Sequence, residues 1–276
     1  MIWFVDFRGR NSGGPVLPGR VVVPAQPLGD PAATVDALAI RQRVVFLVHG
    51  FNVDRAGGQA QLKAFADRLR LAADVALVAV TWPGDSWAGP ASYPLEGNDA
   101  DDTAAELAKF IQWVLPRQTE LSFVSHSLGA RVVFETVKRL PPRAYRVAQL
   151  CVMAAAVDDF SVSEPPVYLR QVEAASRVAV LASERDNVLR WAYPLGDLLQ
   201  SFVFFWKDAG GLALGYHGPR PGRFDPVPAN VTHVQIPTNC GVDHSDYLFP
   251  GQPSPLELRA VAFANQVLNA QTPLTY

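Results

Sequence analysis

The segment at residues 121–129 holds the side chains best suited to do chemistry. Its apolar first half predicts a strand, its last five residues read Ser-His-Ser-Leu-Gly, and an amphipathic helical pattern follows at once. A serine in such a strand–turn–helix bend needs small residues two positions before and after it, because the neighbouring backbone passes close by. Ser125 and Gly129 meet that need. Ser127 is therefore predicted to be a nucleophile beside a helix N-terminus, which favours developing negative charge.

A second turn follows the apolar run at residues 44–48 and reads His49-Gly50-Phe51. Gly50 lets the backbone approach a ligand closely. The N–H groups of Phe51 and Leu128 are predicted to form an oxyanion hole. The His49 side chain is interpreted as a structural hydrogen-bonding group at the end of a strand.

A serine nucleophile needs a base to take its proton, and imidazole titrates in the right range. The chain has five histidines, at positions 49, 126, 217, 233 and 244. His244 follows the predicted strand at residues 231–236, lies in a polar loop and precedes the last helix, so it is the favoured base. His217, in a glycine-rich loop, is the alternative. His126 is expected to point away from the pocket.

A carboxylate must then orient the imidazole and stabilise its charged form. Asp186 follows the apolar run at residues 178–181, and Asp158 follows the run at residues 147–154. Both are at the carboxyl ends of predicted strands, so the residues alone leave both open. Asp243 is poorly placed, because adjacent loop residues seldom turn one side chain onto the other's ring.

Short apolar runs alternate with helical periods along most of the chain. They predict strands at residues 2–7, 21–24, 44–48, 75–81, 121–125, 147–154, 178–181 and 231–236. Helical periods fall around residues 62–69, 107–114, 130–137 and 258–262. This alternation predicts an α/β fold with a doubly wound, mostly parallel sheet. Ligands of such sheets bind beyond the carboxyl ends of the strands, where the candidate residues lie.

The stretch at residues 187–229 is longer than a crossover helix requires and is rich in aromatic residues. It is expected either to form a small cap or lid, or to be an ordinary helix that packs on the sheet. Phe205 and Trp206 from this stretch, together with Trp82, are predicted to line an apolar substrate pocket.

Composition limits the classes of function. The 276 residues carry 24 Lys and Arg against 26 Asp and Glu, a net charge of -2, which disfavours binding to nucleic acid or anionic membranes. The start of the chain lacks the pattern of a signal peptide, and the longest apolar run is too short to cross a bilayer. Cys151 and Cys240 are expected to be buried thiols. These features predict a cytoplasmic protein, and no motif indicates a metal or other cofactor.

Five short motifs occur in an order that resembles the α/β-hydrolase superfamily, within its lipase- and esterase-like branch of mostly uncharacterised members. They are His-Gly-Phe-Asn at 49–52, Trp-Pro at 82–83, Ser-His-Ser-Leu-Gly at 125–129, Ala-Ser-Glu-Arg-Asp at 182–186 and Asp-His-Ser at 243–245. The resemblance covers about three quarters of the chain, residues 44–249. It implies the chain order nucleophile, acid, base, and it favours Asp186 as the acid. Ser125 replaces the commoner glycine.

The resemblance implies that residues 1–276 form a single α/β-hydrolase domain that needs no cofactor. We expect a serine hydrolase that cleaves a small-molecule carboxylic ester through an acyl-enzyme intermediate. A thioesterase, an amidase or an acyltransferase would use the same triad. A non-catalytic binding protein on the same fold is the alternative from another class.

Overall fold

The computed structural model describes residues 2–22, 31–85, 96–165, 167–190 and 212–276. Its strands are β1 (Ile2–Arg8), β2 (Val16–Val22), β3 (Arg43–Val48), β4 (Val75–Thr81), β5 (Glu120–His126), β6 (Arg146–Met153), β7 (Arg177–Ser183) and β8 (Val231–Ile236). Its helices are α1 (Pro31–Ala39), α2 (Arg55–Ala66), α3 (Glu96–Val114), α4 (Gly129–Arg139), α5 (Leu169–Ala174), α7 (Leu214–His217) and α8 (Pro255–Leu268). Single turns of 3₁₀ helix lie at Ser161–Ser163 and Thr238–Cys240.

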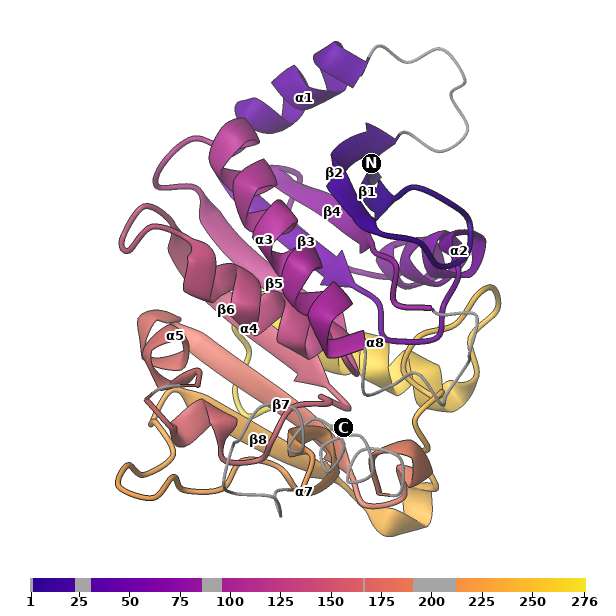
Figure 1. Ribbon diagram of the computed structural model, residues 1–276. Helices are drawn as coiled ribbons and strands as arrows, with labels where there is room; N and C mark the ends of the chain where they lie inside the picture. Colours follow the sequence, from indigo (N-terminus) through magenta and orange to yellow (C-terminus); the bar gives the residue numbers. More distant parts are fainter. Residues whose placement is uncertain (1, 23–30, 86–95, 166, 191–211) are drawn as a thin grey trace.

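The strands form one sheet in the order β2-β1-β4-β3-β5-β6-β7-β8. Only the β1–β2 pair among the described strands is antiparallel, and every other neighbouring pair is parallel. Helices α3 and α4 lie on one face of the sheet, and α2 and α8 lie on the other (Figure 1). The predicted doubly wound, mostly parallel α/β fold is therefore confirmed.

The register of the central strands explains why the candidate residues share one edge. Val48 of β3 is paired with Val80 of β4 on one side and with Ser125 of β5 on the other. The chain segments that continue from these three strands therefore leave the sheet at the same level. They are the turns that begin at His49 and Trp82 and the turn that contains Ser127.

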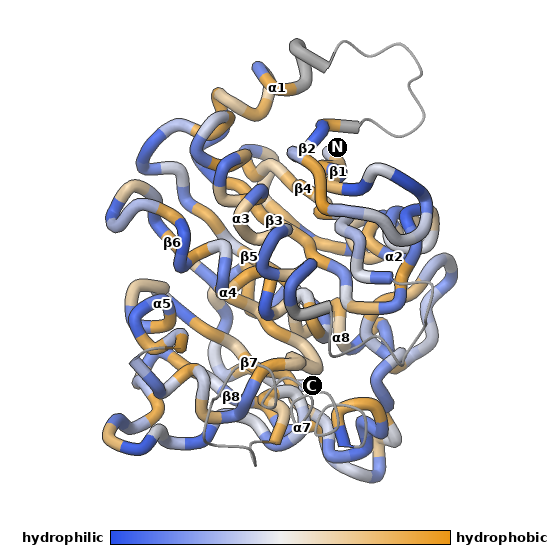
Figure 2. The backbone as a smooth tube through the Cα atoms, in the orientation of Figure 1, coloured by the Kyte–Doolittle hydropathy of each residue, from blue (hydrophilic) through white to orange (hydrophobic). Residues whose placement is uncertain are grey.

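The central strands are apolar on both faces and lie inside the molecule (Figure 2). Phe46 and Phe123 are fully buried, and their rings stack with centroids 5.2 Å apart. Burying a side chain of this size contributes about 1.5–3 kcal/mol to folding. Strand pairs packed in this way form a rigid platform for the loops above them.

The N-terminal hairpin differs in detail from the prediction. Strand β2 begins at Val16 rather than at residue 21, and it includes Pro18 and Gly19. Both residues interrupt the alternation that indicates a strand. An edge strand tolerates a proline because one side of its backbone needs no partner, and β2 is at the edge of the sheet. Helices α1, α5 and α7, which are short, were not predicted.

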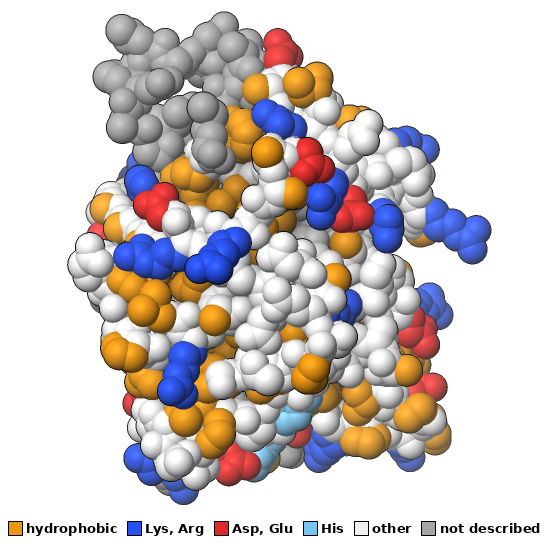
Figure 3. Space-filling view, turned by 180° about the vertical axis from the view of Figure 1, so that it is seen from behind, with side chains coloured by type: hydrophobic (Ala, Val, Ile, Leu, Met, Phe, Trp, Pro, Cys, Tyr) orange, Lys and Arg blue, Asp and Glu red, His pale blue; other side chains and the backbone are white. Residues whose placement is uncertain are grey.

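Three further observations concern the expectations drawn from composition. In the ranges that the structure describes, no helix combines the length and the apolarity needed to cross a bilayer. Cys151 is buried, but Cys240 is only partly buried, so the expectation of two buried thiols is wrong for Cys240. On the face shown in Figure 3, Lys and Arg side chains lie among acidic and apolar ones rather than in one basic patch.

Candidate active site

Ser127 lies in the bend between β5 and α4 and has a left-handed backbone conformation, with φ of 54°. This conformation is rare for a residue with a side chain and must be held by its surroundings. The Ser127 N–H donates to the Met153 carbonyl at 3.1 Å, and the Ser127 carbonyl accepts from Ala156 N–H at 3.1 Å. The end of the neighbouring strand β6 therefore fixes the bend from both sides.

The small residues around the bend are required by close packing. A Cβ atom on Gly129 would lie 2.6 Å from the His49 carbonyl oxygen, and one on Gly50 would lie 2.8 Å from the Ser127 Cβ. Ser125 is almost fully buried, with 1% of its surface exposed. The small residues in the sequence are thus needed because the turn after β3 passes directly beside the bend between β5 and α4. This bend, which holds Ser127, is called the elbow below.

The structure brings Ser127, His244 and Asp186 together from loops that follow three different strands. The His244 Nε2 atom lies 2.9 Å from the Ser127 Oγ, and its Nδ1 atom lies 2.7 Å from a carboxylate oxygen of Asp186. Because a carboxylate accepts, Nδ1 carries the proton and Nε2 can accept from the serine hydroxyl. This is the hydrogen-bonded chain that activates a serine.

Asp186 is fully buried, and its second carboxylate oxygen accepts from the Leu189 N–H at 2.9 Å. The carboxylate is thus held on one side by backbone and on the other by the imidazole. Asp158, the other candidate acid, pairs by its backbone with Ala213, and its carbonyl accepts from the Ser161 hydroxyl. The carboxylate that contacts the His244 ring is that of Asp186.

His126 is a residue of the site that sequence reasoning missed. Its Nε2–H donates to the His244 backbone carbonyl at 2.9 Å, and its ring packs on those of His244 and Tyr247 at 4.8 and 5.5 Å. The His126 side chain therefore faces the loop between β8 and α8 that holds His244, called the base loop below, contrary to expectation. Desolvation by burial, aided by repulsion from His244, holds the pKa of His126 well below its usual range. It is a neutral hydrogen-bond donor.

Asp243 connects the base loop to the loop after β7 that holds Asp186. Its carboxylate accepts from the Asn187 N–H at 2.9 Å and from the Asn187 side-chain amide at 3.1 Å. Burial would raise the pKa of Asp243, but hydrogen bonds from Asn187 and His244 outweigh this and lower it. In addition, the Ser183 hydroxyl donates to the Val242 carbonyl at 2.6 Å. Asp243 is thus a loop-fixing carboxylate.

His217 and His233 make contacts elsewhere. His217 lies 3.3 Å from the carboxylate of Glu184, and His233 lies 3.0 Å from the side chain of Gln235. The alternative base His217 therefore has its own partner. The imidazole beside the Ser127 hydroxyl is that of His244.

The turn after β3 is organised around a buried imidazole. His49 is fully buried, its Nδ1–H donates to the Gly50 carbonyl at 2.8 Å, and its Nε2 accepts from the Trp82 N–H at 3.3 Å. Desolvation, followed by the nearby charge of Arg8, lowers the pKa of His49 to about 3. The ring is therefore neutral and structural, as expected.

The His49 contact also sets the direction of the predicted oxyanion donor. A trans peptide group is planar and its C=O and N–H point in opposite directions. Because the Gly50 carbonyl points at the His49 ring, the N–H of Phe51 points away from that ring. Leu128, the residue of the second predicted donor, is the N-cap of α4 and follows Ser127 directly.

The predicted pocket residues fare differently. Trp82 is fully buried, its Nε1–H donates to the His49 carbonyl at 2.9 Å, and its ring stacks on that of His49. In this conformation Trp82 packs against the turn after β3, and none of its surface is accessible to a substrate. Phe205 and Trp206 lie outside the described residues, as do residues 191–211, about half of the stretch predicted as a cap or lid.

The described residues contain no group of three or more His, Cys, Asp or Glu that could hold a metal ion. Asp101, from an acidic cluster in α3, pairs with Arg131 of α4 through two bonds of 2.8 and 2.9 Å. This acidic residue therefore joins two helices on the same face of the sheet.

A comparison with known protein families agrees with the architecture. A family model described as "Alpha/beta hydrolase of unknown function (DUF900)" matches residues 35–197. The chain is 17% identical to esterase PE8, covering 85% of this chain and 95% of that one, with a TM-score of 0.41. The chain is 14% identical to an esterase of Pyrobaculum calidifontis, covering 84% of this chain and 78% of that one, with a TM-score of 0.41.

For the propionate-bound esterase Est2 of Thermogutta terrifontis, the identity is 12%, 87% of each chain is covered and the TM-score is 0.42. None of the curated proteins compared with the chain matches it. Identities and TM-scores this low carry no argument about activity, which must come from the site itself.

Proposed function

The chain belongs to a family of α/β-hydrolases whose activity is unknown, and from that premise we propose that it is a serine hydrolase that cleaves carboxylic esters. The observation that carries the proposal is the continuous hydrogen-bonded chain from the Ser127 hydroxyl through His244 to the buried carboxylate of Asp186. A serine hydroxyl is a weak nucleophile until a base takes its proton, and this chain supplies that base.

The first half of the reaction forms an acyl-enzyme. As the Ser127 oxygen bonds to the ester carbonyl carbon, its proton moves to Nε2 of His244, and the carbonyl π electrons move onto the carbonyl oxygen. When the tetrahedral intermediate collapses, the bond to the alkoxy oxygen breaks. His244 returns its proton to that oxygen and the alcohol leaves. Water then repeats these steps on the acyl-enzyme, which releases the carboxylic acid and restores the serine.

Asp186 supports the reaction without exchanging its own proton. Its carboxylate holds the imidazole in the tautomer that accepts at Nε2, and it stabilises the imidazolium that forms in each step. The N–H groups of Phe51 and Leu128 are the proposed donors to the oxyanion. Losing one such donor typically lowers the rate about 100- to 1000-fold.

Esters are the proposed substrate class because they make a smaller demand on this machinery than amides. An alkoxide is a better leaving group than an amide anion, and His244 supplies the proton that assists its departure. Thioester hydrolysis, amide hydrolysis and acyl transfer would pass through the same acyl-enzyme. A cytoplasmic location, a single domain, and an acyl pocket lined by Phe205 and Trp206 remain part of the proposal.

The proposal is tested with a panel of p-nitrophenyl esters of graded acyl length, run beside a thioester and an anilide. The wild type is expected to turn over at least one ester faster than the thioester and the anilide, and the Ser127→Ala variant should show no turnover above background. Equal hydrolysis by both proteins would move the nucleophile elsewhere. A folded wild type that hydrolyses none of the compounds would favour a binding protein instead.

A further inference from the structure

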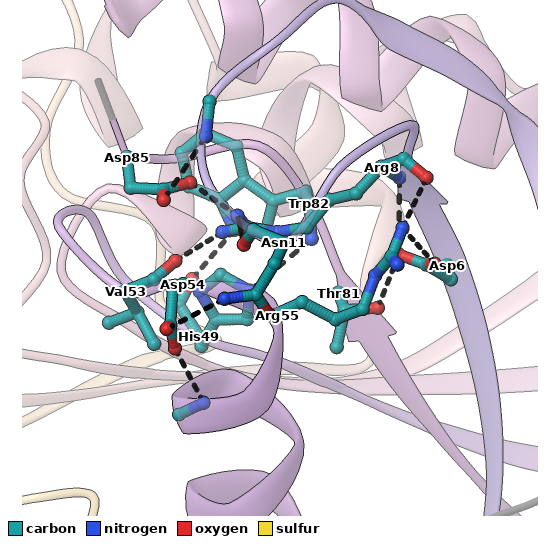
Figure 4. A network of polar contacts seen from close by, with 12 residues as sticks. Asp6, Arg8, Asn11, His49, Val53, Asp54, Arg55, Thr81, Trp82 and Asp85 are labelled. Atoms are coloured by element: carbon teal, nitrogen blue, oxygen red, sulfur yellow. Dashed lines mark hydrogen bonds and ion pairs between the residues drawn. The ribbon is translucent and has the colours of Figure 1, made fainter. Parts of the chain in front are cut away.

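Arg8, the last residue of β1, is buried in a way that demands an explanation. None of its side-chain surface is exposed. A fully buried arginine is rare and costs several kcal/mol of desolvation unless its donors are paired. The guanidinium pairs with the Asp85 carboxylate, and it donates to the backbone carbonyls of Val53 and, at 3.1 Å, of Asn11 (Figure 4).

These contacts join the two turns that surround the predicted oxyanion donor. Val53 belongs to the turn after β3, and Asp85 belongs to the turn after β4. The Asn52 N–H also donates to the Gly84 carbonyl, which closes the same two turns together. Asn52 has φ of 60°, a left-handed conformation that its surroundings must maintain. Arg8 is thus a clamp across both turns.

The turn after β3 is therefore held at both of its ends. At the start, His49 binds the Gly50 carbonyl and is itself held by Trp82. At the end, Arg8 binds the Val53 carbonyl. Phe51 lies between the two fixed points. The direction of the Phe51 N–H depends on both contacts, because only a few backbone torsions separate Phe51 from the held carbonyls of Gly50 and Val53.

The arginine is not an open anion site, since the charges around it are paired internally. Asp85 also accepts from the Gly13 N–H at 3.2 Å. The Arg8 carbonyl accepts from Arg55 at 2.7 Å, and Arg55 pairs with Asp6 at 3.0 Å (Figure 4). A network with this many internal partners fixes geometry rather than binding a diffusible ion.

We infer that Arg8 is a positioning residue for ester hydrolysis: its guanidinium locks the turn at residues 50–53 so that the Phe51 N–H stays directed at the developing oxyanion. The inference rests on the proposed function and adds a residue from outside the triad. A misplacement of about 1 Å at a reacting group can cost roughly 100-fold in rate. Loss of the clamp should therefore act on the transition state more than on substrate binding.

The test compares Arg8→Gln and Arg8→Lys with the wild type and with Arg43→Gln as a matched control. Arg43 begins strand β3, at the end opposite to this turn, and pairs with Asp74 and Glu120 at 3.4 and 3.3 Å. Steady-state kcat and KM are measured with a short-chain p-nitrophenyl ester. They are normalised to the sites that react with a fluorophosphonate, and melting temperatures report folding.

Arg8→Gln is expected to lower kcat per reactive site about 10- to 100-fold, with KM changed less than about twofold. Inhibition by a trifluoromethyl ketone, which forms a negatively charged tetrahedral adduct with the serine, should weaken by the same factor. Arg8→Lys keeps the charge but loses the planar fork of donors, so its kcat should fall between those of Arg8→Gln and the wild type. Arg43→Gln should match the wild type.

A folded Arg8→Gln protein with wild-type kcat per reactive site would overturn the inference while leaving the proposed function intact. The inference also fails if only the number of reactive sites falls. If Arg8→Gln does not fold, Arg8→Lys decides by the same criterion, and failure of both to fold would make Arg8 a residue of the core alone. A wild type without turnover or labelling would instead remove the proposed function.

Discussion

The proposed nucleophile and the proposed base of the candidate site are held by different means. Ser127 is fixed by backbone: its N–H and carbonyl bond to the end of β6, and two glycines allow the β3 turn to press against it. His244 is fixed mainly by side chains from other segments, namely His126 and Asp186. The elbow is therefore rigid by packing, while the base loop depends on a few hydrogen bonds that single substitutions can remove.

The steepest loss should come from changing the acid that orients the base. Asp186→Asn keeps the shape of the side chain but favours the wrong imidazole tautomer, and it should lower kcat about 10⁴-fold. Asp158→Asn is the matched control and should keep most of the activity. Ester kinetics on the two variants decide the matter, and the reverse pattern would make Asp158 the acid.

Acid should destabilise the fold through His49, which is fully buried, and His126, which is partly buried and packs on His244 and Tyr247. The pKa of His49 is lowered to about 3 and that of His126 well below its usual range, so the unfolded state binds more protons than the folded state below about pH 6.5. The contribution of these two groups to the free energy of unfolding is thus fully present well above pH 6.5 and is lost on acidification.

Together the two groups should lower the free energy of unfolding by about 2–3 kcal/mol between pH 7.5 and 5.5. Urea unfolding at each pH measures this change. His126→Phe should remove about half of it. A stability that is flat over this range would mean that both rings are protonated in the folded protein.

Adding one methyl group at each of two glycines compares the close packing around the elbow with the open packing of the base loop. Gly129→Ala places a Cβ 2.6 Å from the His49 carbonyl oxygen, and overpacking of this kind should cost about 1–3 kcal/mol of stability. Gly251, in the loop between His244 and α8, has no atom within 4 Å of an added Cβ. Gly251→Ala should change stability by less than about 0.5 kcal/mol. Equal losses in denaturant unfolding would contradict the difference between the two loops.

The mildest change should follow from removing the hydrogen bond that fixes the base loop. His126→Phe keeps a flat ring between His244 and Tyr247 but removes the donor to the His244 carbonyl. A hydrogen bond of this kind contributes about 1 kcal/mol, so kcat should fall roughly 5- to 10-fold. An unchanged kcat in ester assays would show that the base loop is held without it.

This difference in support also explains what the sequence could predict. The fold class and the position of the elbow follow from local pattern: an apolar strand, small residues at fixed spacing and a helix. The position of Asp186 needed the resemblance to a known superfamily, because Asp158 also follows a strand. The acid–base contact that the structure gives lies between residues 58 positions apart.

The side chains that hold the loops could not be predicted in the same way. His126 contacts a residue 118 positions away, and Arg8 contacts residues 45 and 77 positions away. No local spacing encodes such contacts. Trp82 was predicted as a pocket wall because it follows a strand and is aromatic. Its indole N–H finds a buried carbonyl instead, as buried tryptophans usually require.

Labelling by a fluorophosphonate, read by mass spectrometry of the digested protein, asks whether the Ser127 hydroxyl is an activated nucleophile. We expect one stoichiometric adduct, located on the serine at position 127 of the wild type, and none on the Ser127→Ala variant. A folded wild type that stays unmodified, or an alanine variant modified to the same extent, would contradict the assignment of Ser127 as the nucleophile.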